Sequence, residues 1–302
     1  MKRSPSDWSC VTVESLGTDA LERSSNLLVL GDALNALRKF PDSIFQCCVT
    51  SPPYWGLRDY GIDGQIGSED HLEDYIQNLV LIFREVKRTL TQDGTLWLNI
   101  GDSYTSGNRT WRDLDKKNPA RKMEYRPPTP KGLKPKDLIG VPWRLAFALQ
   151  QDGWYLRSDI IWYKPNCQPE SVKDRPTRAH EYLFLLTKSE KYYYDYESIK
   201  EPARYRSSLK NRRTVWSIKT IPNPYNHFAI FPEALVEPCI IAGSKREDIV
   251  LDPFFGSGTV GVVAQRLNRR FTGIELNPEY VKLSKQRLRE AFCNARITDF
   301  FT

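Results

Sequence analysis

The sequence alternates short apolar runs with longer segments of helical periodicity, and this alternation constrains the fold more than any other feature. The apolar runs are four to seven residues long, which is the length of a buried strand. Between 72 and 90, apolar residues instead recur every three or four positions, as on one face of a helix. Strands that alternate with helices predict an α/β fold, a mostly parallel sheet with helices on both faces. The predicted strands are 27–30, 44–50, 95–100, 158–163, 181–187, 248–252 and 271–275, and the predicted helices are 34–40, 72–90, 142–151, 231–242, 260–267 and 277–292.

Composition excludes several classes of protein. Hydrophobic residues make up 40% of the 302 residues, which is enough for one large domain with a buried core, or for one domain with an inserted lobe. No apolar run approaches the roughly 18 residues that span a bilayer, and the N-terminus lacks the apolar stretch of a secretory signal. The six cysteines form no C-x-x-C pair, and with three histidines no zinc spacing arises. We therefore expect reduced thiols, no metal and no membrane partner.

Positive charge is concentrated in two segments. The chain has a net charge of +7, whereas residues 105–135 alone carry +6 and residues 187–226 carry +5. Both segments lack helical periodicity, so we expect long loops whose cations contact phosphate and whose aromatic rings stack on bases. Solvated loops without a partner are the alternative interpretation. Among the aromatic residues are Trp111 and Tyr125 in the first segment, and Tyr192, Tyr193, Tyr194, Tyr196, Tyr205 and Trp216 in the second.

A glycine-rich turn joins predicted strand 248–252 to predicted helix 260–267. Its sequence, Asp252-Pro-Phe-Phe-Gly-Ser-Gly-Thr259, lets the backbone approach a ligand closely at a helix N-terminus. Glu275 ends the next strand, 19 positions after Gly256, where a carboxylate can accept hydrogen bonds from both hydroxyls of a ribose. NAD, FAD and S-adenosylmethionine all fit such a loop. Asp252 favours S-adenosylmethionine, because a carboxylate there repels a pyrophosphate but attracts the cationic end of a methionine. A packing role for the glycines is the alternative.

A second, rigid turn ends predicted strand 44–50. Its sequence is Thr50-Ser-Pro-Pro-Tyr-Trp55, and its two prolines fix φ and remove two N–H groups. The turn therefore presents carbonyl oxygens and the Ser51 hydroxyl at the sheet edge where open α/β folds bind ligands. Acceptors aimed at one point suit an exocyclic amino group, which has two protons to donate. Tyr54 adds a ring that can stack on a base. A rigid surface turn without function is the alternative.

Taken together, the two turns resemble those of the DNA amino-methyltransferases. In that family a [D/N/S]-P-P-[Y/F/W] turn holds the target amine, and an F-x-G-x-G loop holds S-adenosylmethionine. Here residues 51–54 precede residues 254–258, which is the order of the circularly permuted β group. Serine at the first turn position is typical of cytosine-N4 enzymes, whereas adenine-N6 enzymes usually carry Asp or Asn. The resemblance extends over about residues 27–290 and includes segments 98–104, 162–166, 178–181 and 227–232.

The resemblance implies a role for each matching residue. In the turn, the Ser51 hydroxyl and the Pro52 carbonyl accept the two hydrogens of the target amine, Pro53 keeps the turn rigid, and Tyr54 stacks on the base. In the cofactor site, Asp32 accepts from the adenine amine. The ribose is held by Glu275, with Asn277 beside it. The residues that match the methionine-binding loop are Asp252, Phe254, Gly256, Ser257, Gly258 and Thr259.

The implied fold is the Rossmann-like fold of S-adenosylmethionine-dependent methyltransferases, with the motifs in circularly permuted order. We expect residues 1–26 to be a flexible leader. Residues 27–186 would form the catalytic half of the domain, including the basic loop 105–135. Residues 187–226 would form the target recognition region, and residues 227–302 the half that binds S-adenosylmethionine.

The implied activity is site-specific methylation of DNA. A cytosine flips out of double-stranded DNA and its N4 amine takes the methyl group of S-adenosylmethionine. The resemblance leaves room for a homodimer and for a cognate restriction endonuclease that the enzyme does not bind. A bacterial or phage enzyme would act in the cytoplasm, and a eukaryotic one in the nucleus.

Three rival functions remain open from the residues. They are adenine-N6 methylation, an inactive DNA-binding protein, and a dinucleotide-dependent oxidoreductase, which Asp252 disfavours. We interpret His180 and His227 as packing residues, because nothing places them next to a nucleophile. Trp111 and Trp216 are candidate wedges for the space that a flipped base leaves.

Overall fold

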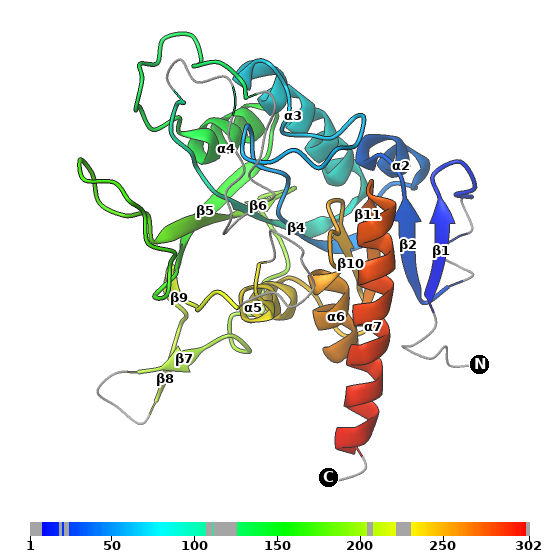
Figure 1. The fold of residues 1–302 in the computed structure, drawn as a ribbon. Coiled ribbons are helices and arrows are strands. Elements are labelled where there is room, and N and C mark those ends of the chain that lie inside the picture. Colours follow the sequence, from blue (N-terminus) through cyan, green and yellow to red (C-terminus); the bar gives the residue numbers. More distant parts are fainter. Residues whose placement is uncertain are drawn as a thin grey trace.

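A nine-stranded sheet runs through the described part of the molecule (Figure 1). The strand order is β1-β2-β11-β10-β3-β4-β6-β5-β9, and within it only β6 runs opposite to its neighbours. The structure, a computed structural model, describes residues 8–17, 20, 24–106, 111, 126–203, 208–221 and 231–299, with side chains to residue 291. The strands are β1 (Trp8–Thr12), β2 (Asn26–Leu30), β3 (Phe45–Thr50), β4 (Leu90–Ile100), β5 (Tyr155–Tyr163), β6 (His180–Thr187), β9 (Val215–Ser217), β10 (Ile249–Asp252) and β11 (Arg270–Glu275).

Helices cover both faces of this sheet, as the sequence predicts. In the described residues α2, α3 and α4 lie on one face, and α5, α6 and α7 lie on the other (Figure 1). All predicted strands and helices appear, with their ends shifted by some residues. The described helices are α2 (Ala33–Lys39), α3 (Leu72–Thr89), α4 (Val141–Gln151), α5 (Glu233–Gly243), α6 (Thr259–Arg266) and α7 (Pro278–Asp299). None of them is long and apolar enough to cross a membrane.

The core has two parts because successive strand residues point to opposite faces of the sheet. In β4, Leu96 and Leu98 pack in the cluster that contains the buried residues of α3 and α4. Trp97, between them, packs in the cluster of α5 and α6. The ring of Trp97 lies 6.4 Å from the ring of Trp216 in β9. Residues on both faces of the strands are therefore apolar, as expected for a sheet buried on both sides.

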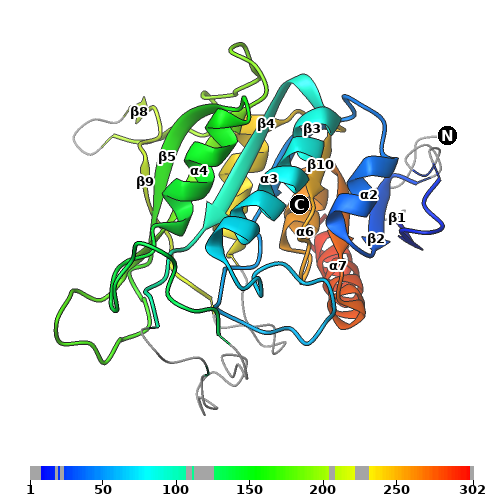
Figure 2. The same ribbon diagram turned by 90° about the horizontal axis from the view of Figure 1, so that it is seen from above.

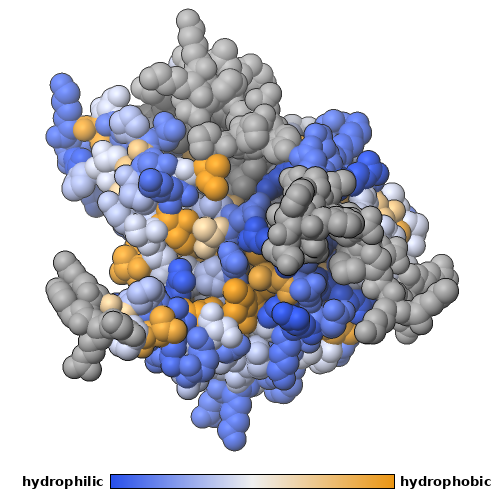
Figure 3. All heavy atoms as spheres, turned by 90° about the horizontal axis from the view of Figure 1, so that it is seen from below, coloured by the Kyte–Doolittle hydropathy of each residue, from blue (hydrophilic) through white to orange (hydrophobic). Residues whose placement is uncertain are grey.

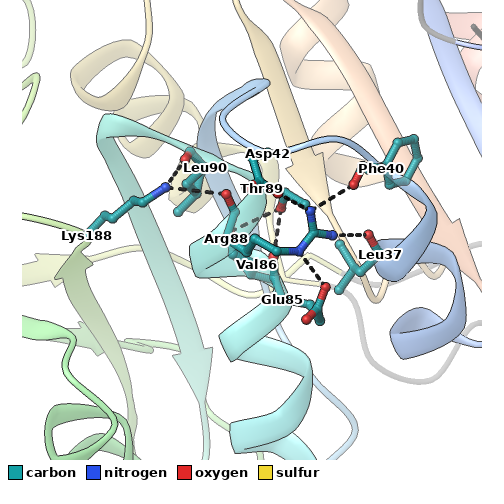
Figure 4. Close-up of polar contacts among 9 residues, drawn as sticks. All are labelled: Leu37, Phe40, Asp42, Glu85, Val86, Arg88, Thr89, Leu90 and Lys188. Carbon is teal, nitrogen blue, oxygen red and sulfur yellow. Dashed lines mark hydrogen bonds and ion pairs between the residues drawn. The ribbon is translucent and has the colours of Figure 1, made fainter. Parts of the chain in front are cut away.

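One edge of the sheet is fixed by the Arg88 cluster, which consists of Leu37, Phe40, Asp42, Glu85, Arg88 and Lys188 (Figure 4). The Arg88 guanidinium donates to the carbonyls of Phe40 and Leu37, each at 2.9 Å, and to the carboxylates of Asp42 and Glu85. Lys188, just after β6, donates to the Leu90 carbonyl at 2.6 Å. These bonds tie the end of α3 to α2 and to the edge where β3 and β4 begin.

The opposite edge of the sheet carries the long loops. Seen from above, the loops that follow β3, β4 and β5 gather there (Figure 2). Seen from below, the face on the α5–α7 side has hydrophobic surface in its middle and hydrophilic surface around it (Figure 3).

Two expectations about chain organisation need correction. We expect a flexible leader over 1–26, but Trp8–Thr12 form β1 and pair in parallel with β2. We also expect 187–226 to be a long loop, but it contains β9 and a small ribbon of β7 (Glu201–Pro202) and β8 (Leu209–Lys210). Strands this short gain their partners from tertiary pairing and leave no periodic pattern in the sequence. Parts of both basic segments, with Tyr125, Tyr205 and His227, lie outside the described residues.

Candidate active site

The two turns singled out in the sequence follow neighbouring strands. Cys48 of β3 pairs with Leu251 of β10, so the chain leaves the sheet at adjacent points after both strands. The Thr50 hydroxyl, at the end of β3, donates to the Asp252 carboxylate at 2.7 Å across 202 positions of sequence. Asp252 also accepts from the Phe254 N–H at 3.1 Å. One buried carboxylate therefore joins the Ser-Pro-Pro-Tyr turn to the glycine loop.

Glu275 organises the predicted cofactor side. Its carboxylate accepts from the Gly256 N–H at 2.7 Å and from the Asn277 N–H at 2.8 Å. Its carbonyl accepts from the Gly31 N–H at 2.9 Å, which brings Asp32 to the same edge. The Asp32 carboxylate accepts from the Asn35 N–H at 2.8 Å and so caps α2. Asn277 in turn accepts from the Glu279 N–H at 2.8 Å as the cap of α7, which the sequence predicts.

Asp252 and Glu275 are carboxylates in a poorly solvated place. Burial raises the pKa of Asp252 to about 7, while the hydrogen bonds from Thr50 and Phe254 act against it. Burial also raises the pKa of Glu275 to about 7, against the backbone N–H groups of Asn277, Gly256 and Leu276. Neither carboxylate forms an ion pair with a described residue. Two such groups at a loop edge suit a ligand that brings positive charge and hydroxyl donors.

A residue of α7 donates hydrogen bonds to the hydroxyls of the glycine loop. Arg287 donates to the Ser257 hydroxyl at 2.7 Å, to the Ser257 carbonyl at 2.9 Å and to the Thr259 hydroxyl at 3.2 Å. Both hydroxyl residues are buried, at 3% and 4% exposure. Their side chains thus hold the loop in shape. Arg287 lies 30 positions after Ser257, so no local pattern in the sequence indicates it.

The glycines of this loop serve two purposes. Gly256 and Gly258 have φ of 51° and 83°, which a residue with a side chain rarely adopts. Gly261 instead makes room for packing, since a Cβ there would lie 2.6 Å from the Phe255 ring. The neighbouring Phe254 packs edge-on against Phe83 of α3, with ring centroids 6.5 Å apart. The loop is therefore held on both faces of the sheet.

The Ser-Pro-Pro-Tyr turn is fixed from behind. The Tyr75 hydroxyl of α3 donates to the Pro53 carbonyl at 2.8 Å, and the Trp55 indole donates to the Glu69 carbonyl at 2.9 Å. Pro52 is buried, whereas Ser51 is half-buried. These contacts leave the turn little freedom, so the acceptors that it presents keep their direction.

Tyr54 is held by its hydroxyl as well as by its ring. The ring packs against Gly101, where a Cβ would lie 2.6 Å from it. The hydroxyl donates to the Glu181 carboxylate at 2.8 Å and lies 3.3 Å from the Asn99 side-chain oxygen and 3.5 Å from the Ser51 hydroxyl. Burial, followed by the charge of Glu181, raises the pKa of Tyr54, so its hydroxyl stays protonated.

An ion pair stands behind Tyr54. Glu181, near the start of β6, pairs with Lys164, which follows β5. The Lys164 ammonium also lies 4.2 Å from the Trp162 ring centroid. The Asn99 amide donates to Glu181 at 3.3 Å and to the Tyr182 carbonyl at 3.1 Å. Burial raises the pKa of Glu181, but Lys164 and the hydrogen bonds outweigh it and lower the pKa overall.

Sequence reasoning assigned no role to Glu181, Lys164 or Asn99. Each lies in a segment that fits the family resemblance, at or beside a strand end. Only the pairing of β4 and β5 with β6 brings them together, and that register is not visible in the sequence.

Aromatic residues of the second basic segment belong partly to the fold. Trp216 is 4% exposed and donates to the Arg213 carbonyl at 2.7 Å, so the wedge interpretation is wrong for this residue. Tyr194 stacks on Trp97 at 6.3 Å. Trp111 is 51% exposed and stays a candidate wedge. His180 packs edge-on against Tyr182 at 5.5 Å, in line with a packing role.

Known proteins are similar to this chain in sequence. The N6/N4 DNA methylase family model matches residues 45–286. The type II methyltransferase M.SmaI of Serratia marcescens is 68% identical over 262 residues, which are 86% of this chain and 90% of that protein. The type II methyltransferase M.Cfr9I of Citrobacter freundii is 62% identical over 280 residues, which are 92% of this chain and 93% of that protein.

Solved structures share the fold. The PvuII DNA methyltransferase, named as cytosine-N4-specific, matches with a TM-score of 0.64 at 21% identity, over 88% of this chain and 90% of that one. A candidate DNA modification methylase of Thermus thermophilus, solved with S-adenosyl-L-methionine, matches with a TM-score of 0.60 at 25% identity, over 88% of this chain and 94% of that one.

Proposed function

The chain belongs to the N6/N4 DNA methylase family, and on that premise we propose that it transfers the methyl group of S-adenosylmethionine to the exocyclic N4 amine of a cytosine in double-stranded DNA. One hydrogen bond carries the proposal. Thr50 and Asp252 join the amine-binding turn to the glycine loop at 2.7 Å, so a methyl donor and a target amine can meet in one place. Such positioning supplies much of the rate of a methyl transfer.

The residues of the loop edge fit a cationic nucleoside. S-adenosylmethionine, when bound, supplies a methyl group on a positively charged sulfur. We assign the ribose hydroxyls to Glu275, with Asn277 beside it, and the adenine amine to Asp32. Asp252 faces the positive end of the methionine, and the absence of an ion pair at this carboxylate among the described residues supports that role. Phe254, Gly256, Ser257, Gly258 and Thr259 form the loop around the methionine.

The target amine meets the turn. Ser51 and the Pro52 carbonyl accept its two hydrogens, which draws the nitrogen lone pair out of conjugation with the ring. Pro53 fixes the direction of both acceptors, and Tyr54 stacks on the base. The cytosine reaches the turn by flipping out of the duplex. A neutral serine is a weak base, so the proton leaves after methyl transfer.

The choice of cytosine over adenine follows from Ser51. A hydroxyl at this turn position is typical of cytosine-N4 enzymes, as the resemblance implies. The test is to incubate the purified protein with DNA and S-adenosylmethionine, digest the DNA and identify the modified nucleoside by mass spectrometry. N4-methyldeoxycytidine supports the proposal. N6-methyldeoxyadenosine supports the rival amine, and the absence of any methylated nucleoside supports an inactive DNA-binding protein.

The wider setting is also a proposal. Residues 105–135 and 187–226 would contact DNA phosphates, the latter as the target recognition region. The relatives are named type II methyltransferases of bacteria, so we place the chain in the bacterial cytoplasm beside a cognate restriction endonuclease that it does not bind. A homodimer would give two target sites related by symmetry.

A further inference from the structure

The polar groups behind Ser51 form a chain that ends at a carboxylate. The Ser51 and Tyr54 hydroxyls lie 3.5 Å apart, and the Tyr54 hydroxyl lies 2.8 Å from one oxygen of Glu181. The other oxygen of Glu181 pairs with Lys164. Four elements contribute, namely the turn after β3, the end of β4, the start of β6 and the segment after β5. The four parts meet beside the proposed target amine.

The carboxylate determines the direction of every hydrogen bond in this chain. An ionised carboxylate can only accept, so Tyr54 must donate its single proton to Glu181. The oxygen of Tyr54 then has only lone pairs left, and Ser51 must donate to it. The lone pairs of Ser51 consequently face away from Tyr54, toward the place of the amine. Hydrogen bonds that run in one direction also strengthen one another.

The surroundings of Glu181 keep it ionised. Lys164 donates to one of its oxygens, while Tyr54 and Asn99 donate to the other. The charges of Glu181, Arg178 and Lys164 all act on the neighbouring His180, whose pKa is lowered mainly by burial. Both Glu181 and Lys164 have 18% of their side chains exposed, so solvent screens the pair only in part. Every described group that bonds to the carboxylate is a donor.

Resting on the proposed function, we propose that Glu181 is a positioning residue for methyl transfer. Held by Lys164, it fixes the direction of hydrogen bonding through Tyr54, so that Ser51 offers lone pairs to the target amine instead of its own proton. The same role serves a cytosine or an adenine amine. Glu181 itself does not touch the substrate.

The first test is Glu181→Gln. An amide has one acceptor oxygen, whereas this site needs acceptors toward both Lys164 and Tyr54. Because Lys164 holds the amide oxygen, the amide NH₂ faces Tyr54. The amide then donates to Tyr54, which reverses the direction of the hydrogen bonds between Tyr54 and Ser51. We expect the single-turnover methylation rate at saturating DNA and S-adenosylmethionine to fall about 100-fold, the cost of a misoriented reacting group. Affinity for S-adenosylmethionine should stay unchanged. The melting temperature should fall, because Lys164 loses its charged partner, so the rates are compared per folded molecule. Glu247→Gln, at an exposed carboxylate before β10, is the matched control.

The second test is a rescue. In Lys164→Met/Glu181→Gln the amide oxygen is free to turn toward Tyr54, and methionine keeps the contact with Trp162. The double variant should methylate about tenfold faster than Glu181→Gln alone, because Tyr54 again donates to an acceptor and the hydrogen bonds recover their original direction. If Glu181 only fills space, the double variant should methylate more slowly than Glu181→Gln, because a second contact is lost.

The outcomes separate this inference from the proposed function. If wild type methylates DNA but Glu181→Gln is equally fast, or the double variant is no faster than Glu181→Gln, the positioning role is wrong. If wild type forms no methylated nucleoside, the proposed function itself fails. Should Glu181→Gln not fold, Tyr54→Phe breaks the same chain while keeping the ring. A Tyr54→Phe rate equal to wild type contradicts the inference, and a drop without loss of S-adenosylmethionine binding supports it.

Discussion

The two edges of the sheet hold charge in opposite ways. Where β3 and β4 begin, the Arg88 guanidinium donates to two carbonyls and two carboxylates (Figure 4). Where β10 and β11 end, Asp252 and Glu275 accept only from a hydroxyl and backbone N–H groups among the described residues. At the first edge the charged groups pair with one another inside the protein. At the second edge the two carboxylates have no counter-ion among the described residues, so a bound ligand can supply one.

This difference distinguishes an edge that stabilises the fold from the edge where we propose that the ligand binds. A charge with a full set of partners stabilises the fold and has nothing left for a ligand. A buried carboxylate without a counter-ion is instead costly to ionise, which appears as the raised pKa of Asp252 and Glu275. Changes at the two edges should therefore affect different properties, one the free energy of unfolding and the other binding and turnover.

The largest effect is expected at the binding edge, for Ser51→Ala. Loss of the hydroxyl removes an acceptor from the target amine and should lower turnover about 10²–10⁴-fold. Ser51 is half-buried and the Thr50–Asp252 bond stays intact, so stability and S-adenosylmethionine binding should change little. Single-turnover methylation and thermal melting measure both. Near-normal turnover of the purified variant contradicts the role of Ser51.

At the structural edge, Arg88→Met should do the reverse. The variant leaves Asp42, Glu85 and two carbonyls without their donor, which should lower the free energy of unfolding by about 2–3 kcal/mol. Methylation per folded molecule should be unchanged. Arg84→Met is the matched control, because Arg84 pairs with Asp152 from a largely exposed position, and its loss should change the free energy of unfolding much less. If urea unfolding shows the same loss of unfolding free energy for both variants, the Arg88 cluster stabilises the fold no more than the exposed pair does, which contradicts the prediction.

A change of pH tests the two unpaired carboxylates. Burial raises the pKa of Asp252 and Glu275 to about 7, whereas carboxyls of an unfolded chain titrate near pH 4. Between about pH 4 and pH 7 the folded protein therefore holds more protons than the unfolded chain, and these groups contribute stability that is lost as the pH rises through 7. The difference in unfolding free energy between wild type and Asp252→Asn should follow this curve.

Ligand binding should show the opposite pH dependence. S-adenosylmethionine is a cation, so the ionised carboxylates favour it, and affinity should rise about tenfold from pH 6 to pH 8 for each group that must ionise. Calorimetric titration at both pH values measures this. An affinity that does not change with pH, in wild type and Asp252→Asn alike, contradicts a contact between these carboxylates and the ligand.

The smallest effect is expected from exposed cations of residues 187–226, the proposed target recognition region. Replacing Arg213 and Lys219 with Gln should weaken DNA binding and lower its salt dependence by about one logarithmic unit per lost phosphate contact. Arg246→Gln, an exposed cation near the start of β10, is the control and should leave the salt slope unchanged. If the salt dependence of DNA binding is unchanged in the double variant, Arg213 and Lys219 do not contact DNA phosphates.

Local patterns were enough to predict most helices and strands and the proximity of the two turns. Helical periodicity and apolar runs are properties of neighbouring residues, so α3 and β4 could be predicted from the sequence alone. The parallel sheet then places the ends of β3 and β10 at one edge, which is why the proximity of Ser51 and the glycine loop could be expected.

Residues defined by strand pairing could not be predicted. Glu181 meets Asn99 and Lys164 only because β6 pairs with both β4 and β5. Arg287 reaches the Ser257 hydroxyl from a helix that follows two further elements. Trp216 looks like a base-stacking residue beside basic neighbours, but its contact with Trp97 makes it part of the core. In each case tertiary packing decides the role of the side chain.

The most direct measurement is a crystal structure of the protein with duplex DNA and an unreactive analogue of S-adenosylmethionine. The account predicts one cytosine outside the helix, with N4 hydrogen-bonded to the Ser51 hydroxyl and the Pro52 carbonyl. N4 should lie about 3–3.5 Å from the analogue atom that replaces the methyl group. An analogue bound away from Asp252 and Glu275, or an extruded base whose amine does not reach Ser51, would contradict a shared site for the two turns.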